Sequence, residues 1–133
     1  MNDLFADSSF YIAAVNPRDG LHGQATALLE NLAGRLVTTD FVLLEVGNWL
    51  SRSRDRALFV ELVKRLRADP NATIVGASRA DFDAGLALYS QRPDKDWSLT
   101  DCISFVVMKR LRLTDALTAD RHFEQAGFTI LLK

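Results

Sequence analysis

Short apolar segments alternate with longer helical segments along this chain, and this alternation restricts the possible folds more than any other feature. The apolar runs expected as strands lie at residues 4–6, 35–39, 72–77, 116–119 and 128–132. Segments with helical periodicity or helix-capping residues lie at 8–15, 21–32, 41–50, 56–66, 79–91, 99–111 and 121–125. Strands separated by helices pair in one direction, because each helix carries the chain back to the start of the next strand. The pattern therefore predicts an α/β fold with a central, mainly parallel sheet.

The length and composition bound the kind of protein. With 133 residues, of which 48% are hydrophobic, the chain is expected to form a single domain over residues 1–133. Its 16 basic and 17 acidic residues leave a net charge of −1, which identifies no partner. The only cysteine, Cys102, excludes an intramolecular disulfide and a cysteine-based zinc site. The N-terminus lacks the basic residues of a signal peptide and no apolar run approaches about 18 residues, so we expect a cytoplasmic protein without a membrane segment.

Four acidic residues lie at the ends of strands or inside apolar helices. Asp7 follows the first predicted strand and Asp120 follows the fourth, so both should emerge at the carboxyl edge of a parallel sheet, where ligands bind. Glu45 lies among leucine and valine residues in "FVLLEVGNWL", and Asp101 lies in the first turn of the apolar helix "LTDCISFVVM". We therefore expect Asp7, Glu45, Asp101 and Asp120 to converge on one site.

Each acidic residue also has a simpler local interpretation. Ser98 and Asp101 have the spacing of a capping box, and Asp7 and Asp120 can each cap the helix that follows. Glu45 is harder to explain locally, because no lysine or arginine lies three or four residues away on its own helix. It must either reach solvent or meet a partner from another element.

Convergence of four carboxylates would require a cation. Two carboxylates about 5 Å apart repel each other by roughly 3 kcal/mol at an effective dielectric constant of 20. Ligation by oxygen atoms alone favours Mg²⁺ or Mn²⁺ over zinc, and such ions typically activate water for attack on a phosphodiester. The sequence thus indicates nuclease chemistry. His22, in a polar loop, and His122, beside Arg121, are expected to have surface roles.

Clustered basic residues are compatible with a polyanionic substrate. The clusters are "RSRDR" at 52–56 and "KRLR" at both 64–67 and 109–112. A solvated helix face is the more frequent explanation for any one such cluster. Trp49, Trp97 and Tyr89 can likewise stack on unpaired bases or pack within the protein.

Four segments together resemble a known family. "FADSSFYIA", "LLEVGNWL", "SLTDCISFVVMKR" and "ALTADRHFEQAGF", in this order and spacing, resemble the PIN-domain family and especially its VapC-type toxins. The resemblance implies a three-layer α/β/α fold and a ribonuclease dependent on Mg²⁺ or Mn²⁺. It also implies a homodimer and a cognate antitoxin that blocks the active site.

The resemblance assigns roles to individual residues. The catalytic and metal-binding residues that it implies are Asp7, Glu45, Asp101 and Asp120. The family's small polar position beside the first aspartate is matched by Ser8 or Ser9, and its Thr-x-Asp step by Thr118.

Three other functions stay open at this point. A PIN-domain nuclease that processes RNA outside a toxin-antitoxin pair would carry the same residues. An α/β phosphotransfer protein is a further alternative, although the sequence lacks a second aspartate two residues after Asp7 and no lysine ends the last strand in the way expected of a receiver domain. A binding module with a vestigial site is the third, and the four intact acidic residues argue against it.

Overall fold

The computed structural model describes residues 3–133, and its centre is a five-stranded sheet. The strands are β1 (Leu4–Ala6), β2 (Leu36–Thr39), β3 (Ala72–Val75), β4 (Asp115–Leu117) and β5 (Thr129–Ile130). They lie in the order β3-β2-β1-β4-β5, and every pair of neighbours is parallel. The predicted parallel sheet is confirmed.

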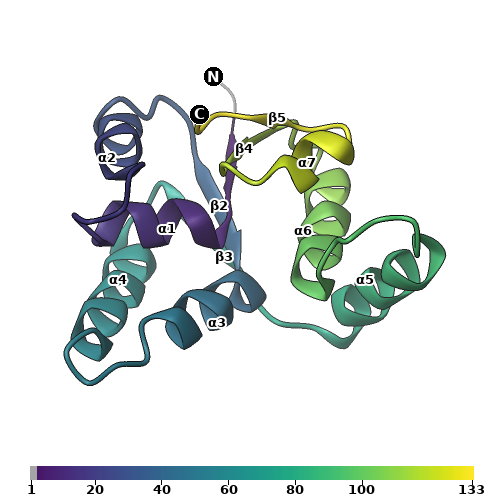
Figure 1. Cartoon of the computed structure of the whole chain (residues 1–133), viewed down its shortest axis with the longest axis horizontal. Coiled ribbons are helices and arrows are strands. Elements are labelled where there is room, and N and C mark those ends of the chain that lie inside the picture. Colours follow the sequence, from purple (N-terminus) through teal and green to yellow (C-terminus); the bar gives the residue numbers. More distant parts are fainter. Residues whose placement is uncertain (1–2) are drawn as a thin grey trace.

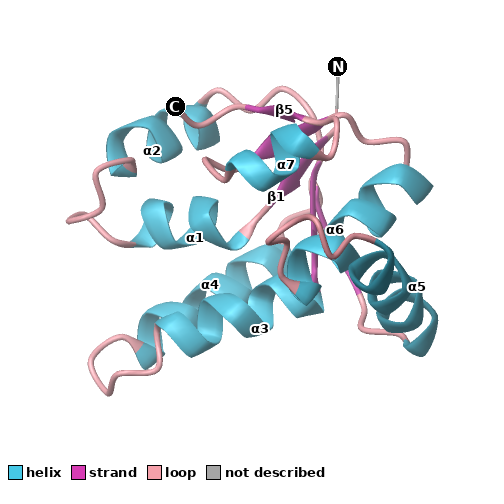
Figure 2. Cartoon of the chain, turned by 45° about the vertical axis from the view of Figure 1, so that its right-hand side comes forward, coloured by secondary structure: helices cyan, strands magenta, loops and turns pink. Residues whose placement is uncertain are grey.

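Helices cover both faces of this sheet. They are α1 (Ser8–Val15), α2 (His22–Glu30), α3 (Asp40–Trp49), α4 (Arg56–Ala68), α5 (Arg79–Gln91), α6 (Leu99–Arg110) and α7 (Arg121–Gln125). Helices α1 to α4 lie on one side of the sheet and α5 to α7 on the other (Figures 1 and 2). This arrangement confirms the three-layer α/β/α fold. Among residues 3–133, no helix combines the length and the hydropathy that a membrane crossing requires.

The central strand, β1, is flanked on one side by β2 and on the other by β4. From β1 the chain passes through α1 and α2 to β2, whereas it enters β4 from α6 on the opposite face (Figure 1). Strand order therefore reverses between β1 and β4, and the carboxyl ends of strands at such a reversal are where open α/β sheets typically bind ligands. Asp7 directly follows β1, and Asp120 lies three residues after β4.

The last three strands are shorter than predicted. Strand β3 ends at Val75 rather than at residue 77, and β5 comprises only Thr129–Ile130. Strand β4 spans Asp115–Leu117 rather than residues 116–119, although the Thr118 carbonyl beyond its end still accepts the Leu132 amide at 3.2 Å.

Helices α5 and α6 pack unusually closely. A Cβ atom added to Gly85 on α5 would lie 2.3 Å from Cγ1 of Ile103 on α6, so only glycine fits at this contact. Asp81 on α5 is buried and forms a bidentate salt bridge with Arg110 on α6. Ser78 and Asp81 have the spacing of a capping box. Ser78 caps α5 by accepting the Asp81 amide, but the Asp81 carboxylate pairs with Arg110, so only half of that box forms.

Aromatic residues of α6 and α7 fill the core on that side of the sheet. Phe105 makes edge contacts with Trp97 and with Phe123, at ring-centroid distances of 5.1 and 4.9 Å. Trp97 is buried and donates a hydrogen bond to Gln125 at 3.1 Å, so it packs within the protein and is not free to stack on a base. Trp49, by contrast, is 70% exposed.

Candidate functional site

Asp7 is a buried carboxylate at the carboxyl end of β1. Its residue is only 3% exposed, and its amide donates to the Leu117 carbonyl of β4 at 3.2 Å. Asp7 occupies the N-cap position of α1 but makes no side-chain capping hydrogen bond. Instead, its Oδ2 accepts a hydrogen bond from the Thr118 hydroxyl at 3.0 Å. The side chain is therefore held for a purpose other than capping.

Thr118 connects the two strand ends. Its fully buried hydroxyl donates to Asp7 and accepts the backbone N–H of Asp120 at 3.0 Å. The Oγ atom of Ser9 lies 3.0 Å from the hydroxyl oxygen of Thr118. A hydroxyl has one proton to donate, and here it is directed to Asp7, so Ser9 acts as the donor in this contact. Thr118 thus contacts Asp7 directly, and Ser9 contacts Thr118.

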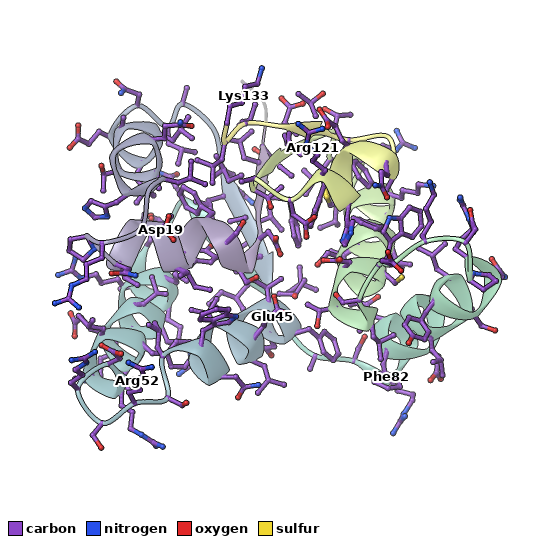
Figure 3. The ribbon with its side chains drawn as sticks, viewed as in Figure 1. Asp19, Glu45, Arg52, Phe82, Arg121 and Lys133 are labelled. Carbon is purple, nitrogen blue, oxygen red and sulfur yellow. The ribbon has the colours of Figure 1, made fainter. Side chains whose placement is uncertain are left out.

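Glu45 on α3 is hydrogen-bonded to a residue of another helix, α1. It lies half-buried on α3, near the centre of the view in Figure 3, and its Oε1 accepts a hydrogen bond from the Ser8 hydroxyl at the start of α1. The partner that its own helix lacks is therefore a neutral hydroxyl from another element. Arg52, from one of the basic clusters, lies at the periphery of the same view.

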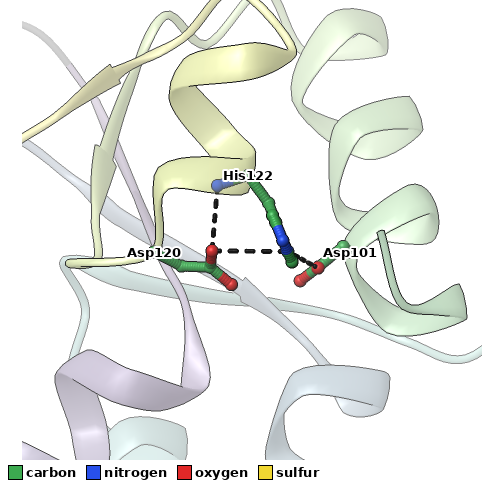
Figure 4. A group of neighbouring side chains, drawn as sticks. All are labelled: Asp101, Asp120 and His122. Carbon is green, nitrogen blue, oxygen red and sulfur yellow. Dashed lines mark hydrogen bonds and ion pairs between the residues drawn. The ribbon is translucent and has the colours of Figure 1, made fainter. Parts of the chain in front are cut away.

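Asp101, Asp120 and His122 form one compact group (Figure 4). The Nδ1 atom of His122 lies 3.0 Å from Oδ2 of Asp101 and 3.4 Å from Oδ1 of Asp120. One ligand atom from each of the three residues lies within 4.8 Å of the other two. These side chains come from the start of α6 and the start of α7, which the fold brings together.

The local interpretations of Asp101 and Asp120 are also correct. Asp101 forms the predicted capping box with Ser98, in which each backbone N–H meets the other residue's side chain, at 3.0 and 3.2 Å. Asp120 caps α7 by accepting the His122 amide at 2.9 Å. The caps fix both carboxylates in place and leave them in contact with the imidazole, so capping and site formation occur together.

The expectation for the histidines was wrong in one case and inaccurate in the other. His122 does not lie on an exposed surface: its side chain is 31% exposed and contacts two of the acidic residues. The one sequence signal for this was the Asp-x-His spacing from Asp120. His22 begins α2 rather than lying in a loop, and its Nδ1 lies 2.7 Å from the Ala13 carbonyl oxygen, away from these residues.

Electrostatic coupling joins Asp7 and Glu45 to the compact group. The pKa of Asp7 is raised from 3.8 to about 7, mainly by burial and further by the negative charges of Asp101 and Glu45, while hydrogen bonds from the Ser8 backbone and the Thr118 hydroxyl partly oppose the rise. Burial also raises the pKa of Asp101, with a further increase from the charge of Asp120. Hydrogen bonding from His122 opposes that rise. Within residues 3–133, no lysine or arginine forms a salt bridge with any of the four carboxylates.

The donor set suits a divalent cation. Asp101, Asp120 and His122 offer two carboxylates and one imidazole in one group. Asp7 and Glu45 are not members of this group, but the charges of Asp101 and Glu45 both act on the Asp7 carboxyl. Oxygen-rich sets of this kind bind Mg²⁺ and Mn²⁺. Asp7 and Asp101, whose pKa values are raised and which have no lysine or arginine partner, are also what a cation would stabilise, because it would replace mutual repulsion with attraction.

The sheet is wholly parallel, and acidic side chains lie at the carboxyl ends of β1 and β4. The chain is therefore an α/β protein whose candidate site has the side chains typical of a metal-binding site. The chain matches the model of the PIN domain over residues 4–129, and it therefore belongs to the PIN-domain family. This confirms the resemblance seen in the sequence.

Individual relatives support the same assignment. The chain is 28% identical over 129 residues to the 23S rRNA-specific endonuclease VapC20 of Mycobacterium tuberculosis, covering 94% of this chain and 95% of that protein. A crystal structure of M. tuberculosis VapC20, described as a sarcin-ricin loop cleaving toxin, matches with a TM-score of 0.88 and 23% identity over 98% of this chain and 99% of that one. VapBC2 from Rickettsia felis, bound to a promoter DNA fragment, matches with a TM-score of 0.68 and 11% identity over 97% of both chains. FitAcB from Neisseria gonorrhoeae matches with a TM-score of 0.67 and 15% identity over 96% of both chains.

Proposed function

We propose that this protein is a divalent-metal-dependent endoribonuclease and the toxin of a toxin-antitoxin pair. The observation that best supports the proposal is the group of Asp101, Asp120 and His122 at the strand-order reversal of a PIN fold, together with the effect of the Asp101 and Glu45 charges on the buried Asp7 carboxyl. The similarity to VapC20 over nearly the whole of both chains supports RNA as the substrate. An RNA substrate also favours the cytoplasm as the place of action.

Asp7, Glu45, Asp101 and Asp120 are the residues that would hold Mg²⁺ or Mn²⁺. Such an ion supplies Lewis-acid polarisation of a phosphodiester oxygen and a water molecule of lowered pKa. The chain's own contribution is to place the ligands. Thr118 orients the Asp7 carboxylate, Ser8 orients that of Glu45, and the two helix caps fix Asp101 and Asp120. Because the pKa of Asp7 is about 7 in the protein alone, metal binding at neutral pH should release part of a proton from this residue.

Cleavage of RNA by the purified protein tests the nuclease assignment. We expect cleavage in the presence of Mg²⁺ or Mn²⁺, none with a chelator, and none by the Asp7→Asn variant, which keeps the shape of the side chain and loses its charge. The exposed Asp83 on α5 provides a matched control, since Asp83→Asn should cleave at the wild-type rate. The 23S rRNA of the VapC20 name is the first substrate to test. Full activity in a folded Asp7→Asn variant would contradict the assignment.

An apolar groove between α3 and α4 is the surface that an antitoxin would cover. It is lined by Leu43, Leu44, Phe59 and Val60 among others. The exposed fractions of Leu44 and Val60 are 64% and 52%, which is high for large apolar side chains. Glu45 lies on the same helix, so a segment packed in the groove could direct an arginine at the acidic site, where a guanidinium fits paired carboxylates. We therefore propose an antitoxin segment that combines apolar residues with such an arginine.

Growth of the host tests the toxin assignment. Expression of the wild-type protein without its antitoxin should arrest growth, and Asp7→Asn, Asp120→Asn or co-expression of the antitoxin should relieve the arrest. Normal growth with soluble protein that cleaves RNA would instead favour a PIN-domain nuclease that processes RNA outside such a pair. The homodimer that the family implies can be measured by light scattering on the same preparations.

A further inference from the structure

We propose that His122 is a nitrogen ligand of the metal ion at this site and makes the site prefer Mn²⁺ to Mg²⁺. The inference rests on the proposed function only for the presence of a divalent ion. It adds a ligand outside the four acidic residues that the sequence indicates, and it gives the site a metal preference.

The separations of the three donor atoms are those of neighbouring ligands. Two ligands at right angles on one six-coordinate ion, each with a bond of about 2.1 Å, lie about 3.0 Å apart. Nδ1 of His122 lies 3.0 Å from one oxygen of Asp101 and 3.4 Å from one oxygen of Asp120. A ligand role therefore requires little movement of the three side chains.

A hydrogen bond alone explains less of this arrangement. A neutral imidazole has one N–H, and if that proton is on Nδ1 it points best to a single acceptor. Nδ1 instead lies close to carboxylates from two different helices, and the four acidic residues form no salt bridge with lysine or arginine within residues 3–133. A proton at Nδ1 and a metal ion would compete for the same place, since a histidine ligand must present its lone pair.

The backbone holds His122 in this position. Its amide donates to the Asp120 carboxylate, which fixes the first turn of α7. The next residue, Phe123, is fully buried against Phe105 of α6, with ring centroids 4.9 Å apart. The backbone that carries the imidazole is thus held in place, which limits the positions that the ring can take, as a ligand role requires.

The chemical consequence is selectivity. Mg²⁺ has little affinity for nitrogen donors, whereas imidazole is a good ligand for first-row transition metals. One imidazole among carboxylates should therefore raise the affinity for Mn²⁺ much more than the affinity for Mg²⁺. A site of carboxylates alone would lack this difference.

Metal binding without RNA tests the proposal. Calorimetric titration of the full-length protein with Mn²⁺ and with Mg²⁺ gives the ratio of the two affinities, and pulsed electron paramagnetic resonance of bound Mn²⁺ detects a directly bound ¹⁴N nucleus. For His122→Asn we expect loss of the nitrogen coupling and a fall in Mn²⁺ affinity of at least about tenfold, with a change below about threefold for Mg²⁺. His122→Asp should likewise lose the coupling while keeping affinity for Mg²⁺.

The other histidine of the chain provides the matched control. His22→Asn should leave the coupling and both affinities unchanged, because the His22 imidazole contacts the Ala13 carbonyl rather than the acidic site. Circular dichroism of each variant checks that it is folded.

The results separate this inference from the proposed function. The ligand role would be overturned if the wild type showed no nitrogen coupling or if the coupling persisted in His122→Asn. It would also be overturned if His122→Asn lost affinity for Mn²⁺ and Mg²⁺ by the same factor. RNA cleavage would then still support the nuclease. Conversely, nitrogen-coupled Mn²⁺ in a protein that cleaves no RNA would support the ligand role and overturn the proposed function.

Discussion

Replacing Asp7 with asparagine should change how the stability of the metal-free protein depends on pH. In the folded protein, burial raises the pKa of this carboxyl to about 7, against an ordinary value of 3.8. Between these two values the folded protein keeps a proton that the unfolded chain has released. The free energy of unfolding therefore falls as the pH rises, and the loss is complete once the pH exceeds about 7. Asparagine has no such proton, so its variant lacks this part of the pH dependence.

The size of the effect follows from the two pKa values. A difference of about three pH units corresponds to about 4 kcal/mol in total, at 1.36 kcal/mol per unit. The part that falls between pH 5 and pH 8 is about 3 kcal/mol, because the unfolded chain is already ionised at pH 5 and the folded protein becomes ionised only near pH 7. Solvent screening reduces this figure little, since Asp7 is only 3% exposed.

Urea unfolding in the presence of a chelator measures the effect. We expect the difference in free energy of unfolding between Asp7→Asn and wild type to shift by about 3 kcal/mol in favour of the variant from pH 5 to pH 8. Any constant cost of placing an amide beside Thr118 cancels in this comparison. Asp83→Asn, which alters an exposed aspartate, should show no such shift. Addition of Mn²⁺ at pH 8 should stabilise the wild type more than Asp7→Asn.

Parallel pH profiles for Asp7→Asn and wild type would refute the reasoning. That result would mean that Asp7 ionises equally easily in the folded and unfolded chains, and that neither burial nor the neighbouring carboxylates hold its proton. A variant less stable than wild type at every pH by a constant amount would lead to the same conclusion.

Three further substitutions test the packing that positions the site. Gly85→Ala should lower the free energy of unfolding by about 2 kcal/mol, because the new Cβ would meet Ile103 Cγ1 at 2.3 Å; a gain in stability would show that α5 and α6 are not this close. Arg110→Met should cost about 2–3 kcal/mol by leaving Asp81 buried without its partner, and the loss should be smaller in Asp81→Leu/Arg110→Met. Equal losses in the single and double variants would contradict that explanation. Gly127→Ala should cost about 1–2 kcal/mol through backbone strain alone, because φ is +98° and no atom lies within 4 Å of the added Cβ; thermal melting that matches wild type would argue against this conformation.

The sequence alone determined the order and type of the elements. Short apolar runs next to helical periodicity predicted all five strands and their parallel pairing, because period and length are local properties of the chain. Helix caps were equally local: the Ser98–Asp101 capping box was predicted from spacing and is present with both hydrogen bonds. Strand ends differed from the prediction by a few residues, as in β4, which ends at Leu117 rather than at residue 119.

The tertiary structure decided which side chains meet. Thr118 and Asp7 are 111 residues apart and share a hydrogen bond only because β1 and β4 are neighbours in the sheet. Asp81 has the spacing of a capping residue, but the approach of α6 brings Arg110 to it, and a charged partner binds a buried carboxylate more strongly than a backbone amide does.

His122 shows most clearly the difference between what the sequence indicates and what the tertiary structure decides. From the sequence it is one histidine on a short helix, and its spacing from Asp120 fits a simple cap. Its contact with Asp101 depends on how α7 packs against α6, which is fixed by Phe105 and Phe123 in the core. Local periodicity thus indicated the strands and helices at whose ends the acidic residues lie. The strand order and the packing of the core depend on contacts between distant residues, and they decided that an imidazole lies beside the acidic residues.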